Sequence, residues 1–200
     1  MIFIHLQYEL NNKQKKVLND SNSLKTSHSL IESFKTYIME KSTDKGGKQL
    51  AILEPFRFTR AATIKTLQKI DQEKWDLQPN GFSNTIRWNA GHIYVTLESL
   101  LHGSDTTYNL IEPSYSAFFK NGTRPSEWKE EAPSAENIIH HLQNQGDRIE
   151  EHFAHRLTEK INQPIQIGPL TLTTYEEIIT FSLFHEGLHL GIISSYIKIT

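Results

Sequence analysis

The sequence has 200 residues, of which 37% are hydrophobic, and a formal net charge of -2 with histidine counted as neutral. That size fits one globular domain with an appendage, and the near-neutral charge gives no indication of a nucleic-acid partner or an anionic membrane surface. The absence of cysteine excludes disulfides, thiolate metal sites and a cysteine nucleophile, so any metal must be bound by His, Asp, Glu or backbone groups.

Residues 1–51 differ in composition from the rest of the chain. They are rich in Lys, Asn and Ser, and the polar, Gly-containing stretch 42–49 predicts a linker. Apolar residues at roughly helical spacing predict one amphipathic helix among them: Leu24, Ile31, Phe34 and Ile38. An alternative is that Met39 is the true start. We expect a helical or disordered N-terminal extension over residues 1–51 and one domain over residues 52–200.

Neither a signal peptide nor a membrane span is predicted. The first residues contain an apolar run of only four, which is too short for the core of a signal peptide. No window approaches 18 consecutive apolar residues. We therefore expect a cytoplasmic chain without a membrane partner.

After this extension, the sequence predicts helices separated by turn signals. The first is expected from Glu54 to Glu73, with Pro55 in its first turn. Its apolar stripe consists of Phe56, Ile64, Leu67 and Ile70. The second is expected from Thr85 to His102, with Gly103 as its stop signal. Its N-cap candidates are Ser83, Asn84 and Thr85.

A long connection over residues 104–133 follows, and its length in a compact domain predicts a packed segment. The third helix is expected from Ser134 to Lys160. A short extended pair is expected within residues 162–174, and the fourth helix from Tyr175 to Ile197. Four helices with a long crossover between the second and third predict an all-α fold, a four-helix bundle in an up-down-down-up or related order.

The last predicted helix carries the motif His-Glu-x-x-His, formed by His185, Glu186 and His189. The two histidines lie at positions i and i+4, so they are neighbours on a helix face that is otherwise mostly apolar. Two imidazoles there can converge on one metal ion, whereas an unpartnered imidazole pair inside a core would be costly. We interpret them as metal ligands rather than as hydrogen-bonded core residues.

Two ligands are too few for a stable metal site, so a third must come from elsewhere in the chain. His92 lies in the middle of the second predicted helix, partly inside its apolar arc, and is the best candidate. His102 ends that helix, where a cationic ring suits the helix dipole. The histidines of the polar third helix are expected to be exposed: His140, His141, His152 and His155.

The same motif is the zinc signature of metalloproteases. The longer protease form continues with Gly and His, where this sequence has Ile192 and Ser195. None of the eleven residues after His189 is His, Asp or Glu, and no sheet that would bind a peptide by strand addition is predicted before the helix. The sequence therefore argues against a protease.

The segment Trp-Asn-Ala-Gly-His-Ile (88–93), together with Phe-His-Glu-Gly-Leu-His-Leu-Gly (184–191), resembles the DinB-like superfamily. The resemblance covers about residues 52–199 and leaves residues 1–51 without a counterpart. It implies a four-helix bundle in which three histidines hold a divalent metal, and it also implies a homodimer. The positions that match the ligands are His92, His185 and His189.

Members similar to this chain include S-transferases that use bacillithiol or mycothiol, a mycothiol-dependent isomerase and metal-dependent hydrolases. The resemblance implies a metal-dependent enzyme of thiol S-transferase or hydrolase type that acts on a small molecule. Its metal would bind a low-molecular-weight thiol such as bacillithiol as the thiolate. Zinc, nickel, iron and manganese all stay open as the metal. The alternative is a non-catalytic metal-binding or stress-response module, which a fourth protein ligand would favour.

Three groups near the predicted ligands have open or minor roles. Glu186 points ~100° away from His185, and it could orient a ligand ring, act as a catalytic base or be solvated at the bundle edge. Asn89, one turn before His92, could reach the metal pocket, but we expect it to be a helix-surface amide. The aromatic residues of the crossover are expected to pack beneath the loop rather than to cover the metal pocket: Tyr115, Phe118, Phe119 and Trp128. No residues are assigned to cofactor binding.

Overall fold

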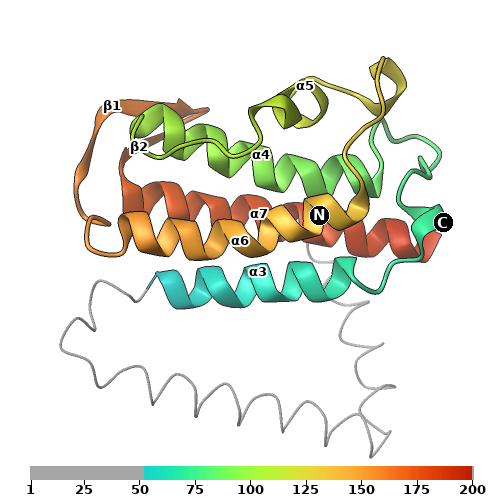
Figure 1. Ribbon diagram of the computed structural model, residues 1–200, viewed down its shortest axis with the longest axis horizontal. Coiled ribbons are helices and arrows are strands. Elements are labelled where there is room, and N and C mark those ends of the chain that lie inside the picture. The colour runs from blue at the N-terminus through green and yellow to red at the C-terminus, as the bar shows by residue number, and fades with distance from the viewer. Residues whose placement is uncertain (1–51, 200) are drawn as a thin grey trace, which may run out of the picture. The chain divides into compact units, whose positions relative to one another are not determined.

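The computed structural model describes residues 52–199, so the predicted N-terminal extension, its helix and the alternative start lie outside the described residues. Four α-helices are long: α3 (Leu53–Leu67), α4 (Ile86–Ser104), α6 (Ala135–Phe153) and α7 (Tyr175–Ile199). These four lie side by side, with α3 and α7 running in one direction and α4 and α6 in the other (Figure 1). The described part of the chain is therefore mostly helical, as the sequence predicted.

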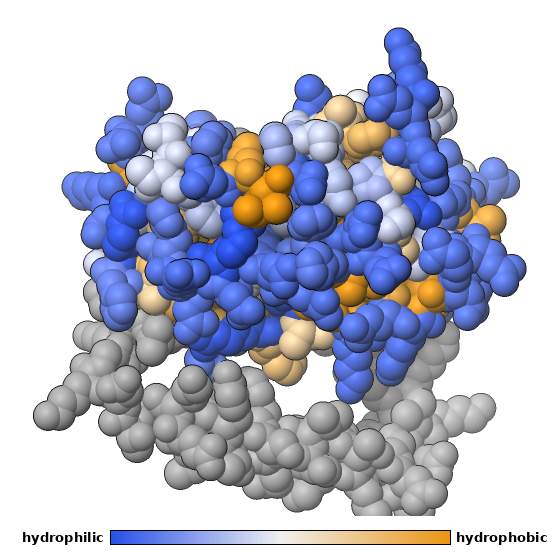
Figure 2. Space-filling view, in the orientation of Figure 1, coloured by the Kyte–Doolittle hydropathy of each residue, from blue (hydrophilic) through white to orange (hydrophobic). Residues whose placement is uncertain are grey.

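Packing among the long helices forms a closed ring, because α4 contacts α7, α7 contacts α3, α3 contacts α6, and α6 contacts α4. The first half of α4 is enclosed on all sides, and every residue from Ile86 to Val95 is buried. Two apolar clusters fill the interior, one containing Trp88 and Ile93 and the other containing Phe153 and Ile178. On the face seen in Figure 2, hydrophilic side chains predominate and hydrophobic ones form small separate patches.

Side-chain caps define where α4 and α6 begin. The hydroxyl oxygen of Thr85, one of the three predicted candidates, accepts a hydrogen bond from the backbone N–H of Trp88. Ser134 caps α6 in the same way through the N–H of Asn137. The Thr85 cap fixes the start of α4 and thereby places His92 about two turns inside the helix.

Two helix ends differ from the prediction. The first helix ends at Leu67 rather than at Glu73, because tight backbone bonds turn the chain after it. A 3-10 turn, η1 (Gln72–Lys74), then brings Trp75 into the core, where its side chain is 1% exposed. The second helix continues through the predicted stop at Gly103 to Ser104, since a glycine in a helix is tolerated at modest cost.

A two-stranded antiparallel hairpin separates α6 from α7, formed by β1 (Lys160–Ile167) and β2 (Leu170–Thr174). Gly168 between the strands has a φ of 56°, which favours glycine. The hairpin confirms the predicted extended pair, but the all-α class omits it. It also explains why the third helix ends at Phe153 rather than at Lys160, since Lys160 pairs with Thr174 in the sheet.

The long crossover between α4 and α6 is packed, as predicted. It contains the short helix α5 (Ser116–Phe119), flanked by the 3-10 turns η2 (Pro113–Tyr115) and η3 (Pro125–Glu127). Tyr115 and Phe119 are buried, and Phe118 and Trp128 pack partly buried against the same cluster. Among the described residues, no helix is long and apolar enough to cross a lipid bilayer.

Candidate metal centre

The interface between α4 and α7 brings together the three histidines that the sequence singled out. His92 comes from α4, and His185 and His189 lie one turn apart on α7. Each ring offers one nitrogen, and these nitrogens all lie within 4.8 Å of one another. His92 and His189 are 7% and 8% exposed, and His185 is partly buried. Two rings of the cluster are thus buried, and the third is partly accessible to solvent.

A backbone carbonyl of the crossover orients the His92 ring. Nδ1 of His92 lies 2.6 Å from the carbonyl oxygen of Phe119. Because a carbonyl only accepts, the Nδ1–H must donate, so Nε2 carries the free lone pair. The indole of Trp88 stacks on the same ring at a centroid distance of 4.5 Å. These two contacts hold the lone pair of His92 toward α7.

The amide of Asn89 orients the His189 ring in the same way. Its Nδ2 donates to the carbonyl oxygen of Thr85 at 2.7 Å, which leaves Oδ1 to accept from Nδ1 of His189 at 2.8 Å. Nε2 of His189 is therefore the nitrogen with a free lone pair. Asn89 is 2% exposed, so the expectation of a helix-surface amide is wrong. Its spacing from His92, just under one turn, was the signal in the sequence that pointed to this role.

The distances between the rings fit a shared metal ion. Nε2 of His92 and Nε2 of His185 lie 3.2 Å apart. Two ligands with metal–nitrogen bonds of about 2.1 Å and angles between 90° and 109° have nitrogens about 3.0–3.4 Å apart. The donor set is also suitable, because imidazole is a ligand for zinc, copper, iron and nickel. The residues present thus fit a divalent metal.

All three rings are held in the neutral form that metals bind. Burial lowers the pKa of His92, although its bond to Phe119 opposes the shift. Burial and the neighbouring His92 lower the pKa of His185 to about 4, against an opposing effect of Glu186. Burial and the two neighbouring rings lower the pKa of His189 to about 3. At neutral pH no proton competes for the nitrogen lone pairs.

The close approach of the crossover to α4 depends on Gly91. A Cβ atom at this position would lie 2.5 Å from Cδ2 and 2.6 Å from Cδ1 of Phe119. Only a residue without a side chain leaves room for the Phe119 ring, which is completely buried. Gly91 therefore allows the Phe119 carbonyl to reach His92. No pattern in the sequence predicts this backbone contact, since the partners are 27 residues apart.

No further His and no Asp or Glu joins the cluster in the part of the chain that the structure describes. Beside His185, a narrow hollow is lined by apolar side chains that include Ile93, Leu100 and Phe181. The hydroxyl of Thr96 lies 3.4 Å from Nε2 of His92. An ion held by the three histidines would keep a coordination position free for a small molecule.

Glu186, the second residue of the motif, is buried away from solvent and paired with Arg60 of α3. Nε and Nη2 of Arg60 donate to its two carboxylate oxygens at 3.0 Å each. Glu186 is 2% exposed, which is incompatible with a solvated place at the bundle edge. A role as catalytic base stays a prediction, and in this structure both of its oxygens are engaged by Arg60.

The comparison with protein families identifies the chain. The family model described as the DinB superfamily matches residues 56–193. The chain belongs to the DinB superfamily. No curated protein matches it. The matched part of this DinB protein spans α4 and most of α7, and so includes all three histidines of the cluster.

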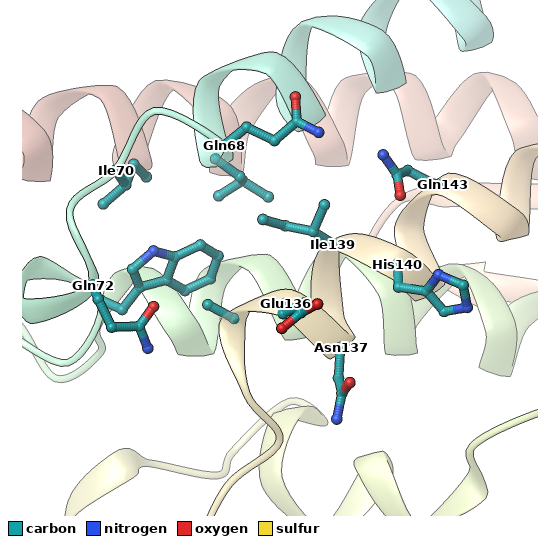
Figure 3. A pocket seen from close by; sticks show the side chains of 11 residues that line it. Gln68, Ile70, Gln72, Glu136, Asn137, Ile139, His140 and Gln143 are labelled. Carbon is teal, nitrogen blue, oxygen red and sulfur yellow. The ribbon is translucent and has the colours of Figure 1, made fainter.

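The other histidines within residues 52–199 lie outside the cluster. His140 and His155 are exposed as expected, whereas His141 and His152 are partly buried. His140 lines a hollow of about 650 Å³ between the end of α3 and the start of α6, together with Gln68, Gln143 and Ile139 (Figure 3). None of the three clustered histidines lines this hollow, so it is not the metal centre.

Proposed function

We propose that His92, His185 and His189 hold a divalent metal ion, and that this DinB protein is a metal-dependent enzyme of thiol S-transferase or hydrolase type. The observation that carries the proposal is the cluster itself, with three neutral imidazoles in one place and no fourth ligand among the described residues. Structural metal sites are usually closed by four protein ligands, whereas catalytic sites keep a position free. We also propose that the four long helices form the four-helix bundle that is typical of such sites.

A bound divalent ion would supply Lewis-acid polarisation of an oxygen or sulfur atom of a small molecule. The chain contributes the orientation of the ligands through Phe119 and Asn89. It also contributes a narrow hollow beside His185, in which apolar residues such as Leu100 and Phe181 lie next to polar ones such as Thr96. Apolar surroundings strengthen electrostatic interactions with a substrate. This combination suits a thiol such as bacillithiol, whose sulfur would be activated as thiolate.

The test begins with metal-free protein titrated separately with zinc, nickel, iron(II) and manganese(II), with bound metal quantified by elemental analysis. The metal that binds at one equivalent is then used with a panel of low-molecular-weight thiols and electrophilic acceptors, and with simple ester and amide substrates. We expect turnover that depends on the metal. Stoichiometric binding without any turnover would instead support a non-catalytic metal-binding module.

We also propose that the chain forms a homodimer through the outer face of α7. Phe184 and Leu188 on this face are 68% and 52% exposed. Gly187 and Gly191 lie beside them with open space around them. Exposed apolar side chains next to small residues suit close helix packing. Analytical ultracentrifugation should give a dimer for the native chain and a monomer for Leu188→Asp, and a monomeric native chain would refute this assembly.

A further inference from the structure

Two of the three clustered histidines are held by hydrogen bonds of their own, and the third is not. His92 donates to Phe119 and His189 donates to Asn89. Within residues 52–199, the only hydrogen-bond contact of the His185 ring is the one between its Nε2 and that of His92. The position of this ring therefore depends on how α7 is set against its neighbours.

Within one protomer, the outer face of α7 contributes little to the rotation of this helix. Gly187 and Gly191 lie on either side of His189, and a Cβ atom at either position would meet nothing within 4 Å. Glycine inside a helix also lowers the stability of that helix relative to alanine. Within one protomer, the contacts that orient this part of the helix therefore come from its buried side.

On that buried side, Glu186 forms an ion pair with Arg60. Both side chains are buried, at 2% and 4% exposure. Nε and Nη2 of Arg60 form a fork on the carboxylate, which fixes direction as well as distance. The other arm, Nη1, donates to Oε1 of Gln145 at 2.8 Å and to the carbonyl oxygen of Leu142 at 2.9 Å. The guanidinium thus ties α7 to both α3 and α6.

We propose that Arg60 and Glu186 are positioning residues of the metal centre. Their ion pair holds α7 at the rotation that directs Nε2 of His185 toward Nε2 of His92. Glu186 is the chain neighbour of His185, so any rotation of the helix that moved the carboxylate would move the imidazole with it. Functional sites require side chains to be held within about 0.5 Å and 10–20°. This inference rests on the proposed role of the histidines as metal ligands.

The test is the zinc affinity of the metal-free full-length chain, measured by competition with a chromophoric chelator. Arg60→Met keeps the length of the side chain but removes the fork. It should weaken zinc binding by about tenfold, the lower end of the effect of losing a group that supports metal ligands. The matched control is Arg57→Met on the same helix, because Arg57 bonds to Glu54 and Glu150 on α3 and α6. Its zinc affinity should be unchanged.

A double-mutant cycle separates positioning from a general effect on the fold. In a His185→Ala background, Arg60→Met should no longer change zinc affinity, because the ring that it positions is absent. In an Asn89→Ala background, its effect should persist. An undiminished effect in the His185→Ala background would show that Arg60 acts on the whole fold, and the proposal would be wrong.

A buried ion pair that loses one partner can unfold a protein. If Arg60→Met does not fold, the neutral double variant Arg60→Met with Glu186→Gln removes both charges together. This variant should fold, as judged by circular dichroism, and bind zinc more weakly than the native chain. Native-like zinc affinity in either folded variant contradicts the positioning role and leaves the proposed metal site intact. A native chain that binds no zinc, nickel, iron(II) or manganese(II) contradicts the proposed metal site, and the positioning role with it.

Discussion

Two buried polar clusters on α4 differ in how their groups are satisfied. Glu98 accepts hydrogen bonds from the hydroxyl of Tyr108 at 2.6 Å, from Nε2 of Gln145 at 2.9 Å and from Nη1 of Arg148 at 3.2 Å. Every contact in this cluster joins a donor to an acceptor, and the contact with Arg148 also joins opposite charges. Such a network needs no other molecule and serves the fold.

The histidine cluster, less than two turns earlier on the same helix, is arranged in the opposite way. Nδ1–H of His92 donates to the carbonyl of Phe119, and Nδ1–H of His189 donates to the side chain of Asn89, so the Nε2 atoms of both rings are acceptors. These acceptors converge with His185 at the α4–α7 interface, which is the arrangement that a cation stabilises. Burial alone therefore does not mark a functional site. What distinguishes this one is that three ring nitrogens able to bind a cation converge within 4.8 Å of one another.

Removal of one histidine from the histidine cluster should have the largest effect on metal binding. His92→Ala, His185→Ala and His189→Ala should each weaken metal binding by at least about 100-fold, beyond the usual effect of losing a supporting group. Elemental analysis after dialysis against the preferred metal measures the loss. His140→Ala is the control, because His140 is exposed on α6. Full metal content in all three variants would rule out the ligand assignment.

The next largest effect should follow from Gly91→Ala, which adds a Cβ against the Phe119 ring. Overpacking of this kind costs about 1–3 kcal/mol. The displaced Phe119 carbonyl should weaken metal binding by about tenfold. Urea denaturation and zinc titration measure the two effects. In the control variant Gly103→Ala on the same helix, the new methyl group meets open space, so stability should rise by about 0.5 kcal/mol. Unchanged zinc affinity in Gly91→Ala would mean that the carbonyl does not support His92.

A change in the polar cluster around Glu98 should lower the stability of the fold and leave metal binding unchanged. Glu98→Gln leaves Tyr108 and Arg148 with a poorer acceptor, and should lower the free energy of unfolding by about 1–3 kcal/mol. Zinc affinity should stay at the native value. Gln145 bonds to both Glu98 and Arg60. A loss of zinc affinity in Glu98→Gln would therefore show that the two clusters are coupled through Gln145.

The smallest effect should come from lowering the pH of metal-free protein from 7 to about 6. The pKa of His185 is about 4 and that of His189 about 3 in the folded chain, against 6.5 for an ordinary histidine. Below pH 6.5 the unfolded chain binds more protons, so stability is complete above that pH and is lost as the pH falls toward 4 and 3. Urea midpoints should therefore decrease slightly. A His185→Ala, His189→Ala double variant should show a flatter dependence, and an equal slope would place the titration elsewhere.

Local patterns predicted much of the fold. The Thr85 cap, the hairpin and the long helices follow from residue types and spacings within a few positions of one another. The end of α6 at Phe153 was missed because it is decided by strand pairing between residues 160 and 174. The end of α3 at Leu67 was missed because the turn that follows it serves to bury Trp75.

The sequence by itself determined which three histidines belong together, since helical spacing paired His185 with His189 and the family motif added His92. Only the tertiary structure decided how they are held. The supporting contacts of Phe119, Asn89 and Arg60 join residues that are 27, 100 and 126 positions apart. Helical periodicity extends over a few turns, whereas the partner of a buried polar group is chosen by how distant helices pack against each other.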